Sequence, residues 1–179
     1  MVYPTPERLQ FPLSSYVVTG RKFLDEAVFG GQSWGRHLGE DCIAEPGTPV
    51  CAIGDGDVVY AELHASWFRR RGNWGHVVIL GHTHAADGQP FYSVYGHLGD
   101  FRVAVGNRVQ GGDTLGTVGK GRTRSNGWWP EPHLHFAIYR GPWEHHVLPG
   151  YSRENDDRTK LEYWVDPSRF VQTYLSPMS

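Results

Sequence analysis

The sequence has no apolar run long enough to cross a membrane. No stretch approaches the ~20 apolar residues that a spanning helix needs. The first 20 residues also lack a continuous apolar segment behind a basic start, so the sequence predicts no membrane span and no secretory signal peptide in this chain. Two interpretations of its location stay open: a cytosolic protein, or a mature sequence whose export signal has been removed.

Strong charge is absent too, since the formal net charge is -2 and the pI is about 6.5. No strong electrostatic field therefore points to nucleic acid or to an anionic membrane. Cysteine is scarce. Cys42 and Cys51 flank a Pro-Gly turn and could face each other across a hairpin, where a disulfide would form if the geometry fits. Two buried free thiols are the alternative.

Helical patterns are few, whereas turn residues are many. The 23 glycines and 12 prolines gather in turn-like clusters, which favours a β-rich fold with short connections. A chain of 179 residues is long enough for one compact domain with a core. We therefore expect an irregular N-terminal arm over residues 1–30, interrupted by Pro4, Pro6 and Pro12, and a single domain over residues 31–179.

This domain is predicted to be mostly β, a compact antiparallel domain with a short C-terminal helix. Residues 42–53 look like a hairpin around a Pro-Gly turn. Further segments rich in β-branched and aromatic residues predict strands at 57–61, 76–80, 91–95, 109, 113–118 and 134–139. Asp166 is a good helix N-cap and Pro167 suits the first helical position. The apolar face of this helix would consist of Phe170, Val171, Tyr174 and Leu175.

Ten histidines are many for a chain of this length, and two groups of them have metal-ligand spacing. His133 and His135 lie in a strand-like segment, where side chains at i and i+2 point to the same face. His37, Gly39 and Asp41 share one face of an extended chain, and the glycine leaves room between the imidazole and the carboxylate. A neutral imidazole and a carboxylate are both good zinc ligands. A histidine and an aspartate at the edge of a surface loop are the alternative.

His97 ends another strand-like segment, and taken alone it could equally be a core or surface histidine. Two histidines and one aspartate make a three-ligand set with an open position, which is typical of catalytic zinc. We therefore predict one Zn²⁺ per chain, held by His37, Asp41 and His135. His97 and His133 then remain to handle protons and charge next to the metal.

Three motifs occur in a fixed order: His37-x-x-x-Asp41, Tyr95-Gly96-His97-Leu98 and His133-Leu134-His135-Phe136. In this pattern the chain resembles the lysostaphin-like (LytM-type) zinc metallopeptidases, which cleave peptide stems or cross-bridges of peptidoglycan. Residues 41–50 are similar to the family's Asp-Ile-Ala-x-Pro-x-Gly-Thr-Pro-Val stretch, and residues 105–119 to its Val-Gly-x-x-Val and Leu-Gly-x-Val-Gly framework. The resemblance covers roughly residues 34–170.

The resemblance implies a zinc-dependent endopeptidase acting on peptidoglycan peptides, with a groove over the sheet and the metal at its floor. It implies His37, Asp41 and His135 as metal ligands. His97 and His133 would orient and deprotonate water or stabilise the oxyanion, with their roles not divided. A location in the cell envelope or outside the cell follows from the resemblance, while a cytoplasmic one stays open. Two alternatives remain: a catalytically silent member that binds or activates other wall hydrolases, and a zinc peptidase of the same fold with a non-wall substrate.

The chain departs from the family pattern just before His133. The loop over residues 125–132 is longer than usual and aromatic, and Ala137 stands where an acidic residue is common. Loops on a rigid β scaffold often determine specificity. We therefore assign Asn126, Trp128 and Trp129 to the substrate groove, with ordinary packing as the alternative for the two tryptophans.

Two other histidine pairs are not assigned to the site. Gly81-His82-Thr83-His84 is similar to the last motif of calcineurin-like metallophosphatases, but the other motifs of those enzymes are missing. We expect His82 and His84 to begin a loop at a strand end. His145 and His146 are expected in a solvated loop, because adjacent side chains on a strand would point to opposite faces.

Overall fold

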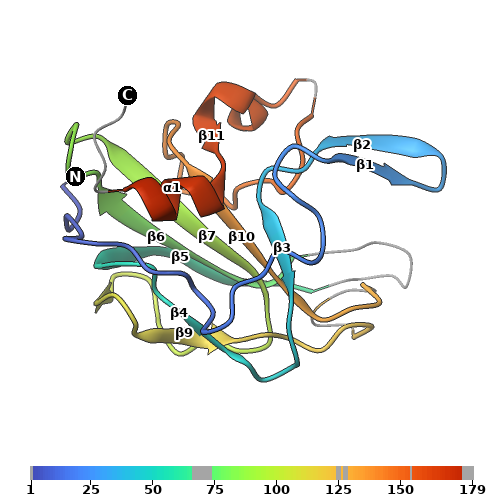
Figure 1. Ribbon diagram of the computed structural model, residues 1–179, viewed down its shortest axis with the longest axis horizontal. Helices are drawn as coiled ribbons and strands as arrows, with labels where there is room; N and C mark the ends of the chain where they lie inside the picture. Colours follow the sequence, from blue (N-terminus) through green and yellow to red (C-terminus); the bar gives the residue numbers. More distant parts are fainter. Residues whose placement is uncertain (1, 66–73, 124–125, 127–128, 154, 175–179) are drawn as a thin grey trace.

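The computed structural model describes residues 2–65, 74–123, 126, 129–153 and 155–174. Within these ranges the fold is built on one antiparallel sheet of seven strands (Figure 1). Six of them follow the order β11-β10-β7-β6-β5-β8, and β3 pairs with the free part of β10. The strands are β3 (Glu40–Ile43), β5 (Gly56–His64), β6 (Gly75–Thr83), β7 (Pro90–Leu98), β8 (Arg108–Val109), β10 (His133–Tyr139) and β11 (Trp164–Val165).

Smaller elements surround this sheet. β1 (Glu26–Phe29) and β2 (Gln32–Arg36) form a hairpin, which projects from the body of the molecule in Figure 1. β4 (Pro49–Cys51) and β9 (Thr114–Thr117) form a second two-stranded sheet. Two short 3₁₀ turns, η1 (Asp157–Thr159) and η2 (Leu161–Tyr163), precede β11, and α1 (Pro167–Thr173) follows it. No helix in the described ranges is long and apolar enough to cross a membrane.

The central strands are apolar on both faces because both faces are covered. Even-numbered residues of β10, such as Leu134 and Phe136, belong to one buried cluster, and odd-numbered Ala137 and Tyr139 belong to another. This alternation follows from the two-residue period of a strand. His133 and His135 therefore lie on the same face of β10 as the second cluster.

The helix α1 covers the first cluster, as the sequence predicts. The Asp166 side chain accepts a hydrogen bond from the backbone N–H of Arg169 at 2.8 Å, and Pro167 occupies the first turn. Val171 and Tyr174 are buried in the core, and Phe170 packs against it; Leu175 lies outside the described residues. The prediction of a mostly antiparallel β domain with a short C-terminal helix is confirmed.

The predicted hairpin over residues 42–53 is wrong. Cys42 in β3 lies opposite Leu134 of β10, whereas Cys51 in β4 lies opposite Thr114 of β9. The turn at 45–48 directs the chain away from the main sheet, because the Gly47 N–H donates to the Val118 carbonyl at 2.8 Å. The two cysteines are free thiols in different sheets.

The boundary of the N-terminal arm differs from the expected one, because residues 1–30 end in the strand β1. The preceding part of the arm is irregular in shape but fixed in place. The Gly20 N–H donates to the Asp41 carbonyl at 3.0 Å, and the Asp41 N–H donates to the Arg21 carbonyl at 2.8 Å. Residues 20–25 therefore run alongside the segment that carries the predicted metal ligands.

Candidate metal centre and active site

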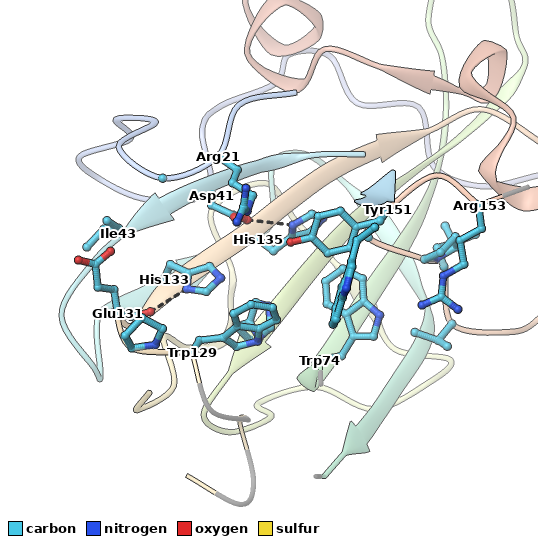
Figure 2. Close-up of a pocket in the computed structure, with 18 of the residues that line it drawn as sticks. Arg21, Asp41, Ile43, Trp74, Trp129, Glu131, His133, His135, Tyr151 and Arg153 are labelled. Atoms are coloured by element: carbon cyan, nitrogen blue, oxygen red, sulfur yellow. Dashed lines mark hydrogen bonds and ion pairs between the residues drawn. The ribbon is translucent and has the colours of Figure 1, made fainter. Parts of the chain in front are cut away.

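Three ligand-type atoms converge where β3 meets β10. His37 Nε2 lies 3.0 Å from His135 Nδ1 and 3.3 Å from Asp41 Oδ1, and His135 Nδ1 lies 3.0 Å from the same carboxylate oxygen. Within the described ranges these three residues form a group of mutually close donor atoms suited to a metal ion. The structure thus brings together the predicted ligand set, of which Asp41 and His135 can be followed in Figure 2.

Strand pairing and one glycine create this convergence. Asp41 lies directly opposite His135 in the β3–β10 ladder, so their side chains share a face. Gly39 permits the close approach, since a Cβ atom there would lie 2.5 Å from the Phe136 carbonyl oxygen and 2.7 Å from His135 Nε2. The space that the missing side chain of Gly39 leaves open is therefore filled by the His135 ring.

The His37 ring is oriented by the N-terminal arm. Its Nδ1 lies 3.1 Å from the Lys22 carbonyl oxygen, which can only accept, so Nδ1 carries the proton and Nε2 is left with a lone pair. A backbone carbonyl that fixes the tautomer of a ligand histidine is a common supporting contact in metal sites. The arm thus contributes directly to the site.

The electrostatics keep Asp41 charged and His135 neutral. Burial by itself would raise the pKa of the Asp41 carboxyl, but hydrogen bonds to His135 and His37 outweigh it and hold the pKa well below its usual range. Burial lowers the pKa of His135 to about 4, against the opposing hydrogen bond to Asp41. Nε2 of His135 is buried without a hydrogen-bond partner in the described part of the chain, which also disfavours the doubly protonated ring.

His97 and His133 lie next to this centre, with ring centroids 4.5 Å apart. His133 Nδ1 lies 2.8 Å from the Glu131 carbonyl oxygen, so Nδ1 donates and Nε2 has the lone pair. His97 adopts a left-handed backbone conformation with a φ of 63°, which is unusual for a residue with a Cβ atom. Burial, followed by the neighbouring His133, holds the pKa of His97 well below its usual value.

Asn126 is placed behind His97 rather than on the pocket wall. Its Oδ1 lies 3.2 Å from His97 Nδ1, and its Nδ2 donates to the His97 carbonyl at 3.2 Å. The side chain is buried. Asn126 thereby fixes both the ring and the strained backbone of His97, a contact that the linear sequence did not indicate.

A pocket of about 510 Å³ opens over these residues. Asp41, His97, His133 and His135 line it, together with the predicted groove residue Trp129. The Trp129 ring lies 5.7 Å from that of His97 and 6.2 Å from that of His133. Trp128 lies outside the described residues.

Several further pocket residues were missed in the sequence. Trp74 precedes β6, and its ring lies 4.8 Å from that of His135. Trp34 comes from β2, and residues 147–151, 153, 156 and 158 supply another wall that includes Tyr151 and Arg153. The sequence signal that could have indicated this wall is the long segment between β10 and β11, which none of the family motifs covers. In the structure this segment is hydrogen-bonded to the site, because residue 150 bonds to residue 38 and residue 152 to residue 36.

The other histidine pairs lie outside the pocket. His82 is not in a loop but in β6, fully buried, where Nδ1 bonds to the Asp55 carbonyl at 2.7 Å and Nε2 to Ser93 Oγ at 2.8 Å. His84, just after β6, is also buried. The His82 and His84 rings each pack against an aromatic side chain, and these apolar contacts account for their burial in the core. His145 and His146 are exposed in a bend.

The antiparallel sheet presents two imidazoles and a carboxylate to one point, beside two more histidines in a pocket, and this arrangement is of the kind found in metal-dependent hydrolases. The chain belongs to peptidase family M23, whose sequence model matches residues 35–148. The resemblance to the lysostaphin-like peptidases is thereby confirmed.

Individual relatives agree with this assignment. The DD-carboxypeptidase/endopeptidase Mpg of Neisseria meningitidis is 36% identical over 104 residues, which is 58% of this chain and 20% of that protein. The glycyl-glycine endopeptidase ALE-1 of Staphylococcus capitis is 37% identical over 106 residues, which is 59% of this chain and 25% of that protein. The chain therefore spans a quarter or less of the length of these relatives.

A solved structure has the same fold. The catalytic domain of lysostaphin from Staphylococcus simulans superimposes with a TM-score of 0.54 at 25% identity, covering 86% of this chain and 90% of that one.

Proposed function

We propose that this chain is a zinc-dependent endopeptidase that hydrolyses peptide bonds in peptidoglycan stems or cross-bridges. The observation that carries the proposal is the convergence of His37 Nε2, Asp41 Oδ1 and His135 Nδ1 within hydrogen-bonding distance of one another. Membership of peptidase family M23 supports the reaction class.

The donor set fits zinc. Two neutral imidazole nitrogens and one carboxylate oxygen are typical ligands of a catalytic zinc site, which keeps a further position open. His37 is held in the required tautomer by Lys22, and the Asp41 carboxyl stays ionised. When bound by such a set, zinc acts as a Lewis acid that activates water for attack on a peptide carbonyl.

His97 and His133 supply the proton chemistry in this proposal. Each ring donates through Nδ1 to a fixed acceptor, so the lone pair on Nε2 is available as a base. Both rings line the pocket, where they would accept a proton from water and, once protonated, stabilise a developing oxyanion. Asn126 and the Glu131 carbonyl hold the two rings in place and take no proton themselves.

The relatives' names support a wall peptide as the substrate. One relative is named a DD-carboxypeptidase/endopeptidase and another a glycyl-glycine endopeptidase. We infer that this chain also cleaves a short peptide link of the wall and works in the cell envelope or outside the cell. The aromatic pocket, with Trp129 beside the catalytic pair, would hold that peptide.

Digestion of purified peptidoglycan tests this function. The zinc-loaded protein should release peptides whose masses, measured by mass spectrometry, identify the bond that is cut. Asp41→Ala should contain little zinc and release nothing, whereas His97→Ala should keep zinc and lose most of its activity, because acid–base help contributes roughly 10²–10⁴-fold in rate. Full zinc occupancy in Asp41→Ala would contradict the ligand assignment.

Two results would favour other functions. A zinc-loaded protein that cleaves no wall preparation but cleaves other peptides would point to a non-wall substrate. A protein that neither holds zinc nor cleaves, yet stimulates another wall hydrolase, would be a silent member of the family.

A further inference from the structure

Besides the metal centre, the pocket contains charged side chains that the proposed mechanism does not use. Arg158 and Asp156 form one matched pair on the wall built by residues 147–151, 153, 156 and 158. The Arg158 guanidinium donates to both carboxylate oxygens of Asp156, at 2.9 Å and 2.8 Å, and to the Val147 carbonyl at 3.1 Å. The Asp156 carboxylate also accepts the Arg158 backbone N–H at 3.1 Å. The charges of this pair therefore compensate each other.

Arg153 on the same wall is different. Its side chain is exposed at the pocket wall, and its guanidinium makes no hydrogen bond or ion pair within the part of the chain that the structure describes. Asp156 feels its charge, as the lowered pKa of that carboxyl reflects after the larger effect of Arg158, but Asp156 already has Arg158 as its partner. Arg153 thus presents a positive charge to the pocket without a matched anion among the described residues.

The backbone of Arg153 is fixed, so the charge has a defined origin. Its N–H donates to Thr159 Oγ1 at 3.0 Å, and the Thr159 hydroxyl donates to its carbonyl at 2.7 Å. Thr159 is buried, and Ser152 is tied to the Arg36 carbonyl at 2.8 Å. The side chain therefore extends from a rigid base, which lowers the entropy that a ligand contact would cost.

The position of Arg153 along the pocket suggests a role in substrate binding. In Figure 2, Glu131 and Arg153 lie toward opposite ends of the pocket, with Asp41 and His135 between them. The same pocket is also lined by the apolar residues Val147, Leu148 and Pro149. A guanidinium matches a carboxylate with two parallel charge-assisted hydrogen bonds.

We propose that Arg153 binds a free carboxylate of the substrate peptide and so selects wall peptides that carry one on the side of the pocket away from Glu131. This inference rests on the proposed function, because it takes the pocket to be the peptide-binding site. The ligand chemistry is a carboxylate on a short peptide, which is either its C-terminal group or an acidic side chain.

A binding experiment tests the proposal independently of turnover. Stem peptides released from purified peptidoglycan are prepared in their native form and with the carboxylates converted to carboxamides. Both are titrated into zinc-loaded His97→Ala protein, in which hydrolysis should be slow compared with the titration, and binding is followed by calorimetry. The same titrations are made with the double variant that carries Arg153→Gln in addition to His97→Ala. The matched control carries Arg102→Gln instead, at an exposed arginine that does not line the pocket.

The expected result is a loss confined to one combination. Arg153→Gln should weaken binding of the native peptides about 10- to 100-fold. It should leave binding of the carboxamide peptides unchanged, and Arg102→Gln should alter neither. Equal binding of native peptides to the parent and Arg153→Gln proteins, or an equal loss for both peptide forms, would overturn the proposal. If Arg153→Gln does not fold, Arg153→Lys takes its place, because lysine keeps the positive charge but lacks the two parallel N–H donors of the guanidinium. It should show a smaller loss of binding, again for native peptides alone. No loss in Arg153→Lys would count against the carboxylate site.

Peptides amidated only at the C-terminus or only at an acidic side chain then identify which carboxylate is bound. The peptide that binds the parent and Arg153→Gln proteins with equal affinity is the one whose amidated carboxylate Arg153 recognises. Failure of the zinc-loaded protein to cleave any wall material, together with the expected binding difference, would reject the proposed function and retain the carboxylate site.

Discussion

At the residue scale, fixed acceptors determine which nitrogen carries the proton in three of the site histidines, His37, His97 and His133. The Lys22 and Glu131 carbonyls accept from Nδ1 of His37 and His133. Asn126 does the same for His97 and also holds its backbone carbonyl. Because a carbonyl oxygen cannot donate, these contacts place the proton of each neutral ring on Nδ1 and leave the lone pair on Nε2. The proposed chemistry therefore depends on these supporting acceptors as well as on the histidines.

The role of Asn126 leads to a kinetic prediction. Asn126→Ala should lower kcat roughly 10- to 100-fold, the usual cost of losing a supporting contact to a site histidine, while KM and zinc content change little. Steady-state kinetics with zinc analysis makes this measurement. Asn107→Ala is the matched control, since the side chain of that exposed asparagine accepts a hydrogen bond from the Ala104 N–H in a loop that does not line the pocket. A parallel loss of zinc in Asn126→Ala would show that the residue supports the metal centre rather than His97.

At the element scale, the pairing of β3 with β10 brings the candidate metal ligands together. The ladder places Asp41 opposite His135, and His37 joins them from the segment just before β3. The arm hydrogen-bonds to that segment at Asp41, and the wall residue Tyr151 bridges to His37. The loop before β10 contributes Trp129 to the pocket. Its effect on specificity stays a prediction.

Gly39 is where this arrangement is most sensitive. Gly39→Ala should prevent the β3–β10 approach, because its Cβ would meet the Phe136 carbonyl oxygen at 2.5 Å and the His135 ring at 2.7 Å. We expect loss of zinc and of activity together with a lowered melting temperature. Metal analysis and thermal unfolding test this.

Gly47→Ala controls for the loss of a glycine as such. Gly47 has a φ of +88° and open space around it, so the change should cost only about 1–2 kcal/mol from left-handed strain. It should keep zinc and activity. A Gly39→Ala protein with full zinc content would show that the two strands can separate without disturbing the ligands.

At the scale of the whole molecule, the sheet is buried on both faces and a polar group is enclosed in its core. His82 in β6 is fully buried and stacks on Phe91, with its two nitrogens bonded to the Asp55 carbonyl and to Ser93. Burial lowers the pKa of His82 to about 4, against the opposing contact with Asp55. The folded state therefore holds this ring neutral.

This lowered pKa predicts a loss of stability in acid. Between an ordinary pKa near 6.5 and about 4, the unfolded chain binds a proton at His82 that the folded protein does not, so the free energy of unfolding falls as the pH falls through this window. The contribution is about 3 kcal/mol, fully present above pH 6.5 and lost by about pH 4. Urea unfolding at a series of pH values measures it.

His82→Gln separates this contribution from those of other acid-titrating groups. The variant should be less stable at pH 7, yet its stability should change less between pH 7 and pH 4 than that of the parent protein. An identical pH dependence in both proteins would mean that His82 does not stay neutral in the fold.

The sequence by itself determined the fold class, the C-terminal helix and the candidate site residues. Strand alternation, the Asp166–Pro167 helix start and the spacing of His37, Asp41 and His135 are local features, and each follows from the geometry of a few neighbouring residues. The same local rules failed at residues 42–53, where a turn sequence compatible with a hairpin instead connects two different sheets.

Only the tertiary structure decided what surrounds the candidate ligands. The Lys22 carbonyl, Trp74 and Arg153 come from three distant parts of the chain, and no periodicity or motif marks them. The burial of His82 was likewise invisible, because a histidine beside a strand end is enclosed or exposed according to what packs over it. Spacing specifies which side chains share a face, but contacts between distant segments depend on how the whole chain packs, and these contacts form the pocket walls.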